Sequence, residues 1–200
     1  MMSTNDKYIM RQIAKAEKEL MDGAVKWLDI VMCSSIIALS RYWGWKKDRL
    51  SKLQEIQEEV WNEVASDNDV SMIQLLDAEC GIELTNHEGV SYRDVIYLNT
   101  AIDDGVQLTK YQYLAMRRNQ AKWTEAQITA CIILAMHRKE GWGFKRAREL
   151  LKRMQQIKEE YDYDQEKLIA AAKSECDIDW TGRGKLDDRI EDLRRSERAE

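Results

Sequence analysis

The chain has 200 residues, no proline, nine glycines and a net charge of −5. This length suffices for one large domain or two small ones, and the negative charge excludes the overall basic excess of non-specific nucleic-acid binders. Residues 1–100 contain 11 Lys and Arg and 17 Asp and Glu, which gives a net charge of −6. Residues 101–200 contain 20 Lys and Arg and 19 Asp and Glu, which gives +1. This distribution is compatible with a local basic face in the second half.

Apolar periodicity predicts helices throughout the chain. The missing proline and scarce glycine favour long helices with short polar connections. Helices are expected over 5–22 and 25–42, with a break at Asp22-Gly23, and then over 46–65 and 70–79. A capping box at Ser91 opens another helix to about 102, followed by helices over 108–120, 124–140, 144–160 and 165–175. Because no convincing strand pattern is present, the sequence predicts an all-α fold.

The same pattern occurs twice, over about residues 27–84 and 123–180. Each copy has an apolar run with a cysteine, an aromatic-glycine turn, an amphipathic helix and an acidic-Cys ending. The turn is Trp43-Gly44-Trp45 in the first copy and Trp142-Gly143-Phe144 in the second. Repeats fix architecture, so we expect an internally duplicated helical fold with pseudo-twofold packing. The predicted divisions are helical units over 1–84 and 121–180, a connecting helical segment over 85–120 and a charged tail over 181–200.

Cysteine usage and hydropathy indicate a cytoplasmic protein. Cys33 and Cys131 lie in apolar runs, and Cys80 and Cys176 lie near segment ends. Such positions are typical of buried free thiols. We see no run approaching the roughly 18 apolar residues that span a bilayer, and the polar N-terminus does not resemble a signal peptide.

The aromatic-glycine turns are the most specific local signal. Glycine at a helix end can adopt positive φ, so the turns predict helical hairpins held by packed aromatics. The alternative is a helix-turn-helix DNA-binding regulator that uses the basic helix at 144–158. Basic side chains at a helix start oppose the macrodipole, which favours an external anionic partner, although the later Glu159 and Glu160 also fit a solvated face.

A second alternative comes from carboxylates on one helix. Glu55, Glu58 and Glu59 can share a face, and all-α nucleotide pyrophosphohydrolases bind magnesium with similar helices. This pattern favours a Mg-dependent nucleotide hydrolase or nucleotide-binding protein. His87 and His137 lack neighbouring ligands at zinc spacing. For the leading interpretation we expect no catalytic residue, no metal site and no cofactor.

The segment Ala135–Arg146 resembles a pattern in small uncharacterised proteins of phages and prophages of Gram-positive bacteria. Those proteins have an apolar helix ending in Leu-His, an aromatic-glycine turn with Lys or Arg, and an amphipathic helix. The first copy departs from the pattern at Ser40. The resemblance implies an all-α phage accessory protein that acts on host machinery or host defences.

The expected function is therefore that of a non-enzymatic accessory protein in the cytoplasm of a bacterial host cell. It would engage a host protein and inhibit host machinery or a defence system. Nucleic acid is the alternative partner, a homo-oligomer is compatible with the pattern, and no membrane contact is expected. Tryptophan and arginine often anchor interfaces. The predicted partner-binding residues are Trp43, Trp45, Trp142, Phe144, Lys145, Arg146, Arg148 and Lys152.

Overall fold

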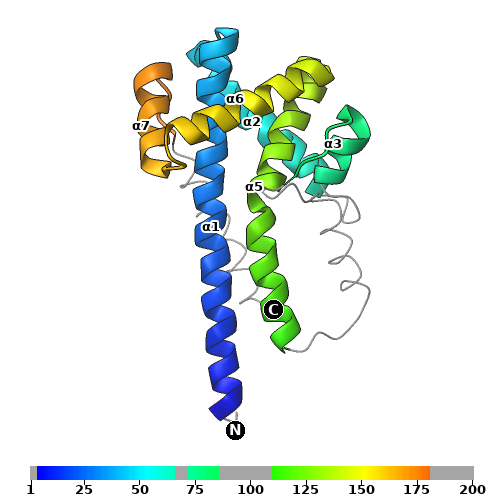
Figure 1. Cartoon of the computed structure of the whole chain (residues 1–200), viewed down its shortest axis with the longest axis vertical. Helices are drawn as coiled ribbons and strands as arrows, with labels where there is room; N and C mark the ends of the chain where they lie inside the picture. Colours follow the sequence, from blue (N-terminus) through cyan, green and yellow to red (C-terminus); the bar gives the residue numbers. More distant parts are fainter. Residues whose placement is uncertain (1–3, 66–71, 86–109, 181–200) are drawn as a thin grey trace. The chain divides into compact units, whose positions relative to one another are not determined.

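The computed structural model describes residues 4–65, 72–85 and 110–180 (Figure 1). Its helices are α1 (Thr4–Trp43), α2 (Lys47–Ala65), α3 (Met72–Cys80), α5 (Lys110–Glu140), α6 (Phe144–Glu160) and α7 (Gln165–Cys176). The described residues contain no β-strand, which confirms the predicted all-α fold. The helix expected up to about residue 102 and the charged tail lie outside the described residues.

Two predicted helix breaks are absent. Gly23 lies inside α1, so the expected break at Asp22-Gly23 was wrong. One interior glycine costs a helix only about 1 kcal/mol, and no proline is present to end it. The helices expected over 108–120 and 124–140 likewise form the single helix α5. Every other described helix begins and ends within two residues of its predicted position.

Four helices end on a residue with a left-handed backbone. These residues are Gly44 (φ +66°), Gly81 (φ +62°), Gly141 (φ +66°) and Asp177 (φ +55°). The residue that follows each of them is apolar and buried, as is common after such helix ends: Trp45, Ile82, Trp142 and Ile178. Each left-handed residue therefore turns the chain so that its successor enters the core.

The two aromatic-glycine turns have the same geometry in a different register from the one expected. After α1, the N–H of Gly44 donates to Ser40 over 3.1 Å. After α5, the N–H of Gly141 donates to His137 over 3.1 Å. Gly44 and Gly141 therefore have the same backbone conformation at the end of a helix, whereas the sequence pattern predicted it at Gly44 and Gly143. The residue with positive φ marks the end of the helix, and the φ of Gly143 is not positive.

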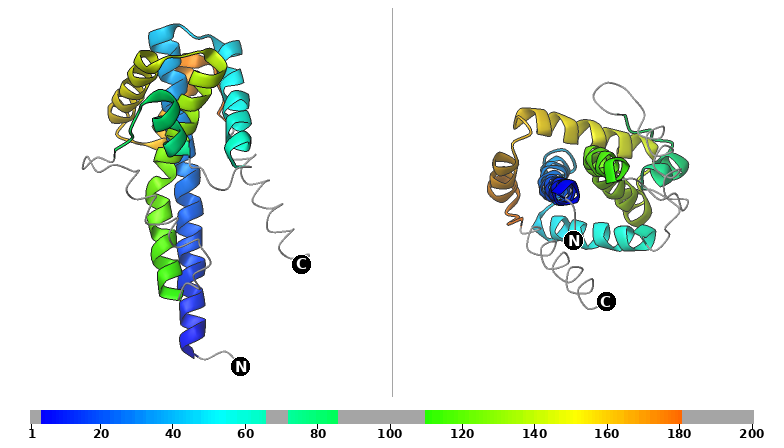
Figure 2. Two further views of the ribbon diagram at one scale, coloured as in Figure 1. Left: turned by 90° about the vertical axis from the view of Figure 1, so that its right-hand side faces the viewer. Right: turned by 90° about the horizontal axis from the view of Figure 1, so that it is seen from below.

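The chain forms two compact units that do not follow its sequence order. Unit 1 comprises residues 1–24 and 55–149, and unit 2 comprises residues 25–54 and 150–200. In unit 1, α3 packs against α5 (Figures 1 and 2). In unit 2, the end of α7 contacts α1, where Cys176 faces the backbone oxygen of Ile36. Each unit therefore combines segments of both predicted copies, whereas the expected units were consecutive.

Buried aliphatic side chains form both cores. Complete burial of one such side chain contributes about 1.5–3 kcal/mol, so this packing is the main source of stability. The largest fully buried side chains of unit 2 are Ile30, Met32, Ile36, Ile37, Leu39, Leu50 and Leu53. Those of unit 1 are Leu76, Ile132, Ile133, Leu134 and Met136.

All four cysteines are buried free thiols, as their sequence positions predict. Burial raises the pKa of Cys131 to about 12. Burial also raises the pKa of Cys33, and the nearby Asp29 adds to this effect. The pKa values of Cys80 and Cys176 are raised by the same desolvation. The thiols therefore serve as small apolar side chains of the core.

One segment within the described residues, Asp22–Trp43 in α1, is long and apolar enough to cross a membrane. The expectation that no stretch approaches this length was therefore wrong. Of its most apolar window, 61% is buried inside the protein, and it contains the charged residue Asp29. A mostly buried apolar helix is what a protein core requires, so length and composition alone are weak evidence for a membrane span.

We predict that Gly44→Ala and Gly141→Ala each lower the free energy of unfolding by about 1 kcal/mol, because an L side chain disfavours positive φ. Urea unfolding of the purified variants measures this effect. Gly23→Ala is the matched control. It lies inside a helix with open space around the added methyl group, so it should stabilise the protein by about 0.5–1 kcal/mol. Equal effects at all three positions would contradict the assignment of the turns.

Candidate functional site

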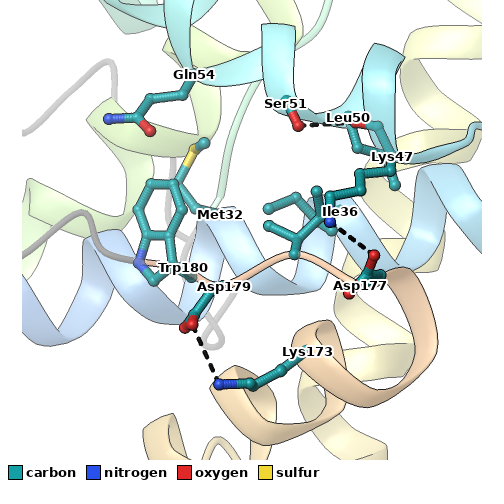
Figure 3. A pocket seen from close by; sticks show the side chains of 11 residues that line it. Met32, Ile36, Lys47, Leu50, Ser51, Gln54, Lys173, Asp177, Asp179 and Trp180 are labelled. Carbon is teal, nitrogen blue, oxygen red and sulfur yellow. Dashed lines mark hydrogen bonds and ion pairs between the residues drawn. The ribbon is translucent and has the colours of Figure 1, made fainter.

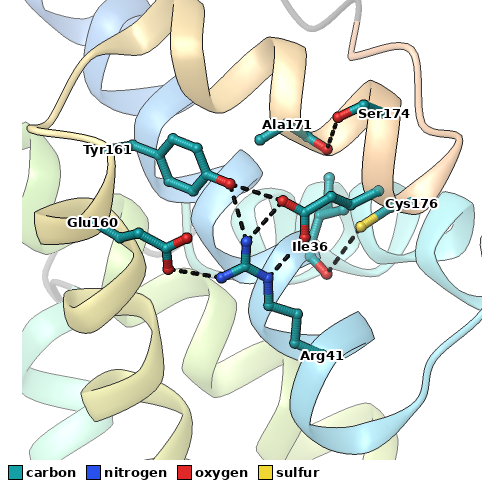
Figure 4. A network of polar contacts seen from close by, with 8 residues as sticks. Ile36, Arg41, Glu160, Tyr161, Ala171, Ser174 and Cys176 are labelled. Atoms are coloured by element: carbon teal, nitrogen blue, oxygen red, sulfur yellow. Dashed lines mark hydrogen bonds and ion pairs between the residues drawn. The ribbon is translucent and has the colours of Figure 1, made fainter.

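In unit 2, a network around Arg41, here called the Arg41 clamp, joins α1 to α7 (Figure 4). The Arg41 guanidinium donates to both carboxylate oxygens of Glu175 over 2.7 Å, and its Nη1 donates to Glu160 over 2.7 Å. The Tyr161 hydroxyl donates to Glu175 over 2.7 Å. The hydrogen bond from Arg41 is the largest cause that lowers the pKa of Glu175. The Arg41 clamp thus joins Arg41 to Glu175, which lies 134 positions later in the sequence.

Unit 1 contains a corresponding arrangement, the Arg138 clamp, between α5 and the α2–α3 region. Arg138 donates to the two carboxylate oxygens of Glu79 over 3.0 and 2.5 Å, and to Glu63 over 3.3 Å. Lys139 pairs with Glu59 over 3.0 Å and with Glu63 over 3.2 Å. The hydrogen bond from Arg138 is the largest cause that lowers the pKa of Glu79.

The Arg138 clamp gives a structural role to carboxylates that resembled a magnesium motif. Of the three glutamates in that pattern, Glu59 pairs with Lys139 and so holds α2 to α5, together with the neighbouring Glu63. Glu55 is exposed and Glu58 is half-buried. Within the described segments, no group of three or more His, Cys, Asp or Glu side chains is placed to hold a metal ion. The geometry therefore supports a packing role for this acidic helix.

The predicted partner-binding residues do not form one surface. Trp45 and Trp142 are 4% and 3% exposed and belong to the core, because each follows a left-handed residue that turns it inward. Trp43 is half-buried beside Tyr42, with ring centroids 6.2 Å apart. Lys152 is exposed and belongs to unit 2. The remaining predicted residues, Phe144, Lys145, Arg146 and Arg148, lie together at the start of α6 in unit 1.

These four residues define the α6-start surface. Phe144 is 45% exposed, and the Arg148 guanidinium lies 5.8 Å from its ring centroid. Lys145 and Arg146 are exposed beside it, and they line a shallow cavity of about 420 Å³ with Gly141, Gly143 and Phe144. Arg148 is exposed as well. An exposed aromatic ring is thus surrounded by positive charge.

A second cavity, the unit 2 pocket, lies between α1, α2 and the segment that follows α7 (Figure 3). Its volume is about 450 Å³. The apolar lining consists of Met32, Ile36, Leu50, Ile178 and Trp180, and the polar lining of Lys47, Ser51, Gln54, Lys173, Asp177 and Asp179. Lys47 pairs with Asp177 over 2.6 Å, and Lys173 pairs with Asp179 over 3.1 Å.

Behind this pocket, a buried carboxylate fixes the tryptophan of the wall. Asp29 is 0% exposed and accepts a hydrogen bond from Trp180 Nε1 over 2.6 Å. Its other oxygen accepts from Gln165 Nε2 over 2.5 Å. A buried carboxylate is costly unless it is hydrogen-bonded, and Trp180 and Gln165 supply these hydrogen bonds to Asp29.

Neither this pocket nor the Asp29 network is predicted by the sequence pattern. The available signal was a single aspartate inside the apolar run of α1, where a charged residue requires a specific partner. Its partners, Gln165 and Trp180, are far away in the sequence, so no local pattern could identify them. No protein-family model, curated protein or solved structure matches this chain.

We predict that acid destabilises the protein partly through Glu79 and Glu175. Their pKa values in the folded state lie below the ordinary value of 4.5, chiefly because of the hydrogen bonds from Arg138 and Arg41. The clamp stabilisation is therefore fully present above the ordinary pKa and is lost as pH falls through the depressed folded-state value. The double variant Glu79→Gln/Glu175→Gln should show a flatter decline in unfolding free energy over this range, measured by urea unfolding at several pH values.

Glu55→Gln serves as the control for this experiment, because Glu55 is exposed and lies outside both clamps. It should leave the slope of stability against pH nearly unchanged. A double variant with the slope of the unmodified protein would show that the clamps do not couple protonation to folding.

Proposed function

We propose that this chain is a non-enzymatic binding protein whose α6-start surface engages an acidic patch on a host protein. The exposure of Phe144 among Lys145, Arg146 and Arg148 is the observation that carries this proposal. An aromatic anchor with neighbouring arginines is typical of the residues that dominate protein interfaces. Carboxylates of a partner would supply the counter-charges for the three cations.

The position of these cations at a helix start supports an external acidic partner. The N-terminal end of a helix carries partial positive charge, so basic side chains there are disfavoured by about 0.3–1 kcal/mol each. α6 has no acidic residue in its first turn, and the α6-start surface therefore concentrates positive charge in a protein of net charge −5. A partner with an acidic patch would relieve this repulsion.

We also propose that the chain is internally duplicated and that its copies exchange segments. Gly44 corresponds to Gly141 at a spacing of 97 residues, and Gly81 to Asp177 at a spacing of 96. Arg41 of the first copy pairs with Glu175 of the second, and Arg138 of the second copy pairs with Glu79 of the first. This reciprocity is the pattern expected when two equivalent segments each complete the other's unit.

A cellular role follows from the resemblance of Ala135–Arg146 to phage and prophage accessory proteins. We propose that the chain acts in the bacterial cytoplasm, where binding of the acidic partner inhibits host machinery or a defence system. A DNA-binding regulator is the rival for the same surface, since phosphates also attract Lys145, Arg146 and Arg148. Nuclease treatment and salt dependence separate these two alternatives.

The proposed binding is tested by capture from nuclease-treated bacterial lysate with the full chain as bait. We expect one protein to be retained in stoichiometric amount by the unmodified chain and lost with Phe144→Ala or Arg146→Glu. With the captured protein purified, Phe144→Ala should weaken binding about tenfold or more, because interface aromatics often contribute 2 kcal/mol or more. Calorimetric titration measures this change.

The control is Lys46→Glu, a charge change at an exposed residue just before α2 in unit 2. It should bind the partner like the unmodified chain. If Lys46→Glu and Arg146→Glu weaken binding equally, the α6-start surface is not the contact. Retention of nucleic acid alone, with steep loss as salt rises, would replace the proposal by the DNA-binding alternative.

The exchange of segments predicts that the two halves of the chain stay together after cleavage. A protease site inserted within residues 86–109 allows the purified full chain to be cut once. Since both units contain residues from before and after this segment, the two fragments should elute together in native size-exclusion chromatography and separate in denaturing urea. Fragments that separate under native conditions while retaining helical circular dichroism would contradict the exchanged arrangement.

A further inference from the structure

The unit 2 pocket combines an apolar wall with a rim of balanced charge. From this combination we infer that the pocket binds a small aromatic zwitterion of the aromatic amino acid class. The inference is independent of the proposed partner binding, because the α6-start surface belongs to unit 1. It rests on the cavity, the fixed position of Trp180 and the arrangement of the rim charges.

The cavity has the size and lining of a small-molecule site. Its volume of about 450 Å³ lies within the range of about 300–1,000 Å³ typical of such sites. Met32, Ile36 and Leu50 line the cavity where it borders the packed core of unit 2, and their exposed fractions are only 0–2%. Trp180 adds an aromatic surface to the wall, against which a second ring can pack (Figure 3).

Trp180 is held in place before any ligand enters. Its Nε1 donates to Asp29, whose second oxygen is occupied by Gln165. A buried carboxylate that binds an indole in this way restricts the rotation of the ring. Less conformational freedom is then lost on binding, which increases affinity.

The rim determines the charge of the ligand. Lys47 with Asp177 and Lys173 with Asp179 place two cations and two anions around the cavity (Figure 3). A purely anionic ligand would be attracted by the two lysines and repelled by the two aspartates. A purely cationic ligand would be attracted by the aspartates and repelled by the lysines. A zwitterion forms favourable pairs with both kinds of group.

Exchange of these ion pairs for pairs with a ligand costs little. The side chains of both pairs are more than half exposed, and such solvent-exposed pairs contribute little net stability. A ligand carboxylate can therefore replace Asp177 or Asp179 at a lysine, while the ligand ammonium takes the released aspartate. Its aromatic ring then lies against the apolar wall formed with Trp180.

The test is a calorimetric titration of the full chain with L-tryptophan, tryptamine and indole-3-propionate, which share one ring system. We expect L-tryptophan to bind at one site and each singly charged analogue to bind about tenfold more weakly, because each lacks one charge-assisted contact. Absence of saturable L-tryptophan binding would overturn the inference. Equal binding of either analogue would overturn the zwitterion assignment in the same way.

Matched variants locate the binding in the pocket. Lys47→Gln and Asp179→Asn should each weaken L-tryptophan binding about tenfold. The neighbouring exposed residues Lys46 and Asp48 do not line the cavity, so Lys46→Gln and Asp48→Asn should leave the affinity unchanged. Thermal unfolding of each variant confirms that it is folded. Equal losses in pocket and control variants would show that binding occurs elsewhere.

Discussion

Each compact unit depends on an arginine that closes a long apolar helix against a carboxylate from a remote part of the chain. Arg41 meets Glu175 in unit 2, and Arg138 meets Glu79 in unit 1. The clamps are partly exposed, so buried aliphatic side chains contribute more to stability than these ion pairs do. The clamps join segments that are far apart in the sequence, since each arginine meets a carboxylate more than 50 residues away.

The two units share this clamp but differ in the features that can bind a partner. Unit 1 has an aromatic and basic helix start, where Phe144 is exposed among cations. Unit 2 instead has a pocket, which Lys47 at the start of α2 lines. Unit 2 also contains the hydrogen bond between the buried Asp29 and Trp180, which holds Trp180 in the pocket wall.

The left-handed helix ends explain why tryptophans that resemble interface anchors are core residues. Trp45 and Trp142 each follow a glycine with φ +66°, and this backbone turn directs them inward. In the linear sequence, Trp142-Gly143-Phe144 looks like the better counterpart of Trp43-Gly44-Trp45. Only the backbone shows that Gly141 ends α5 and that Phe144 is exposed. The candidate surface therefore retains Phe144 and three of the four predicted basic residues, and it loses Lys152 and all three predicted tryptophans.

The sequence alone determined the all-α class, the positions of most helices and the burial of four thiols, because apolar periodicity and missing proline act over neighbouring residues. It also identified the basic start of α6. The register of the second turn became clear only from the backbone conformation of Gly141. The tertiary structure decided the pairing of segments and the unit 2 pocket. These depend on contacts across more than 50 residues, such as Arg138 with Glu79 and Asp29 with Trp180. Local patterns contain no information about such partners, since each charge could pair with many others until the packed core selects one.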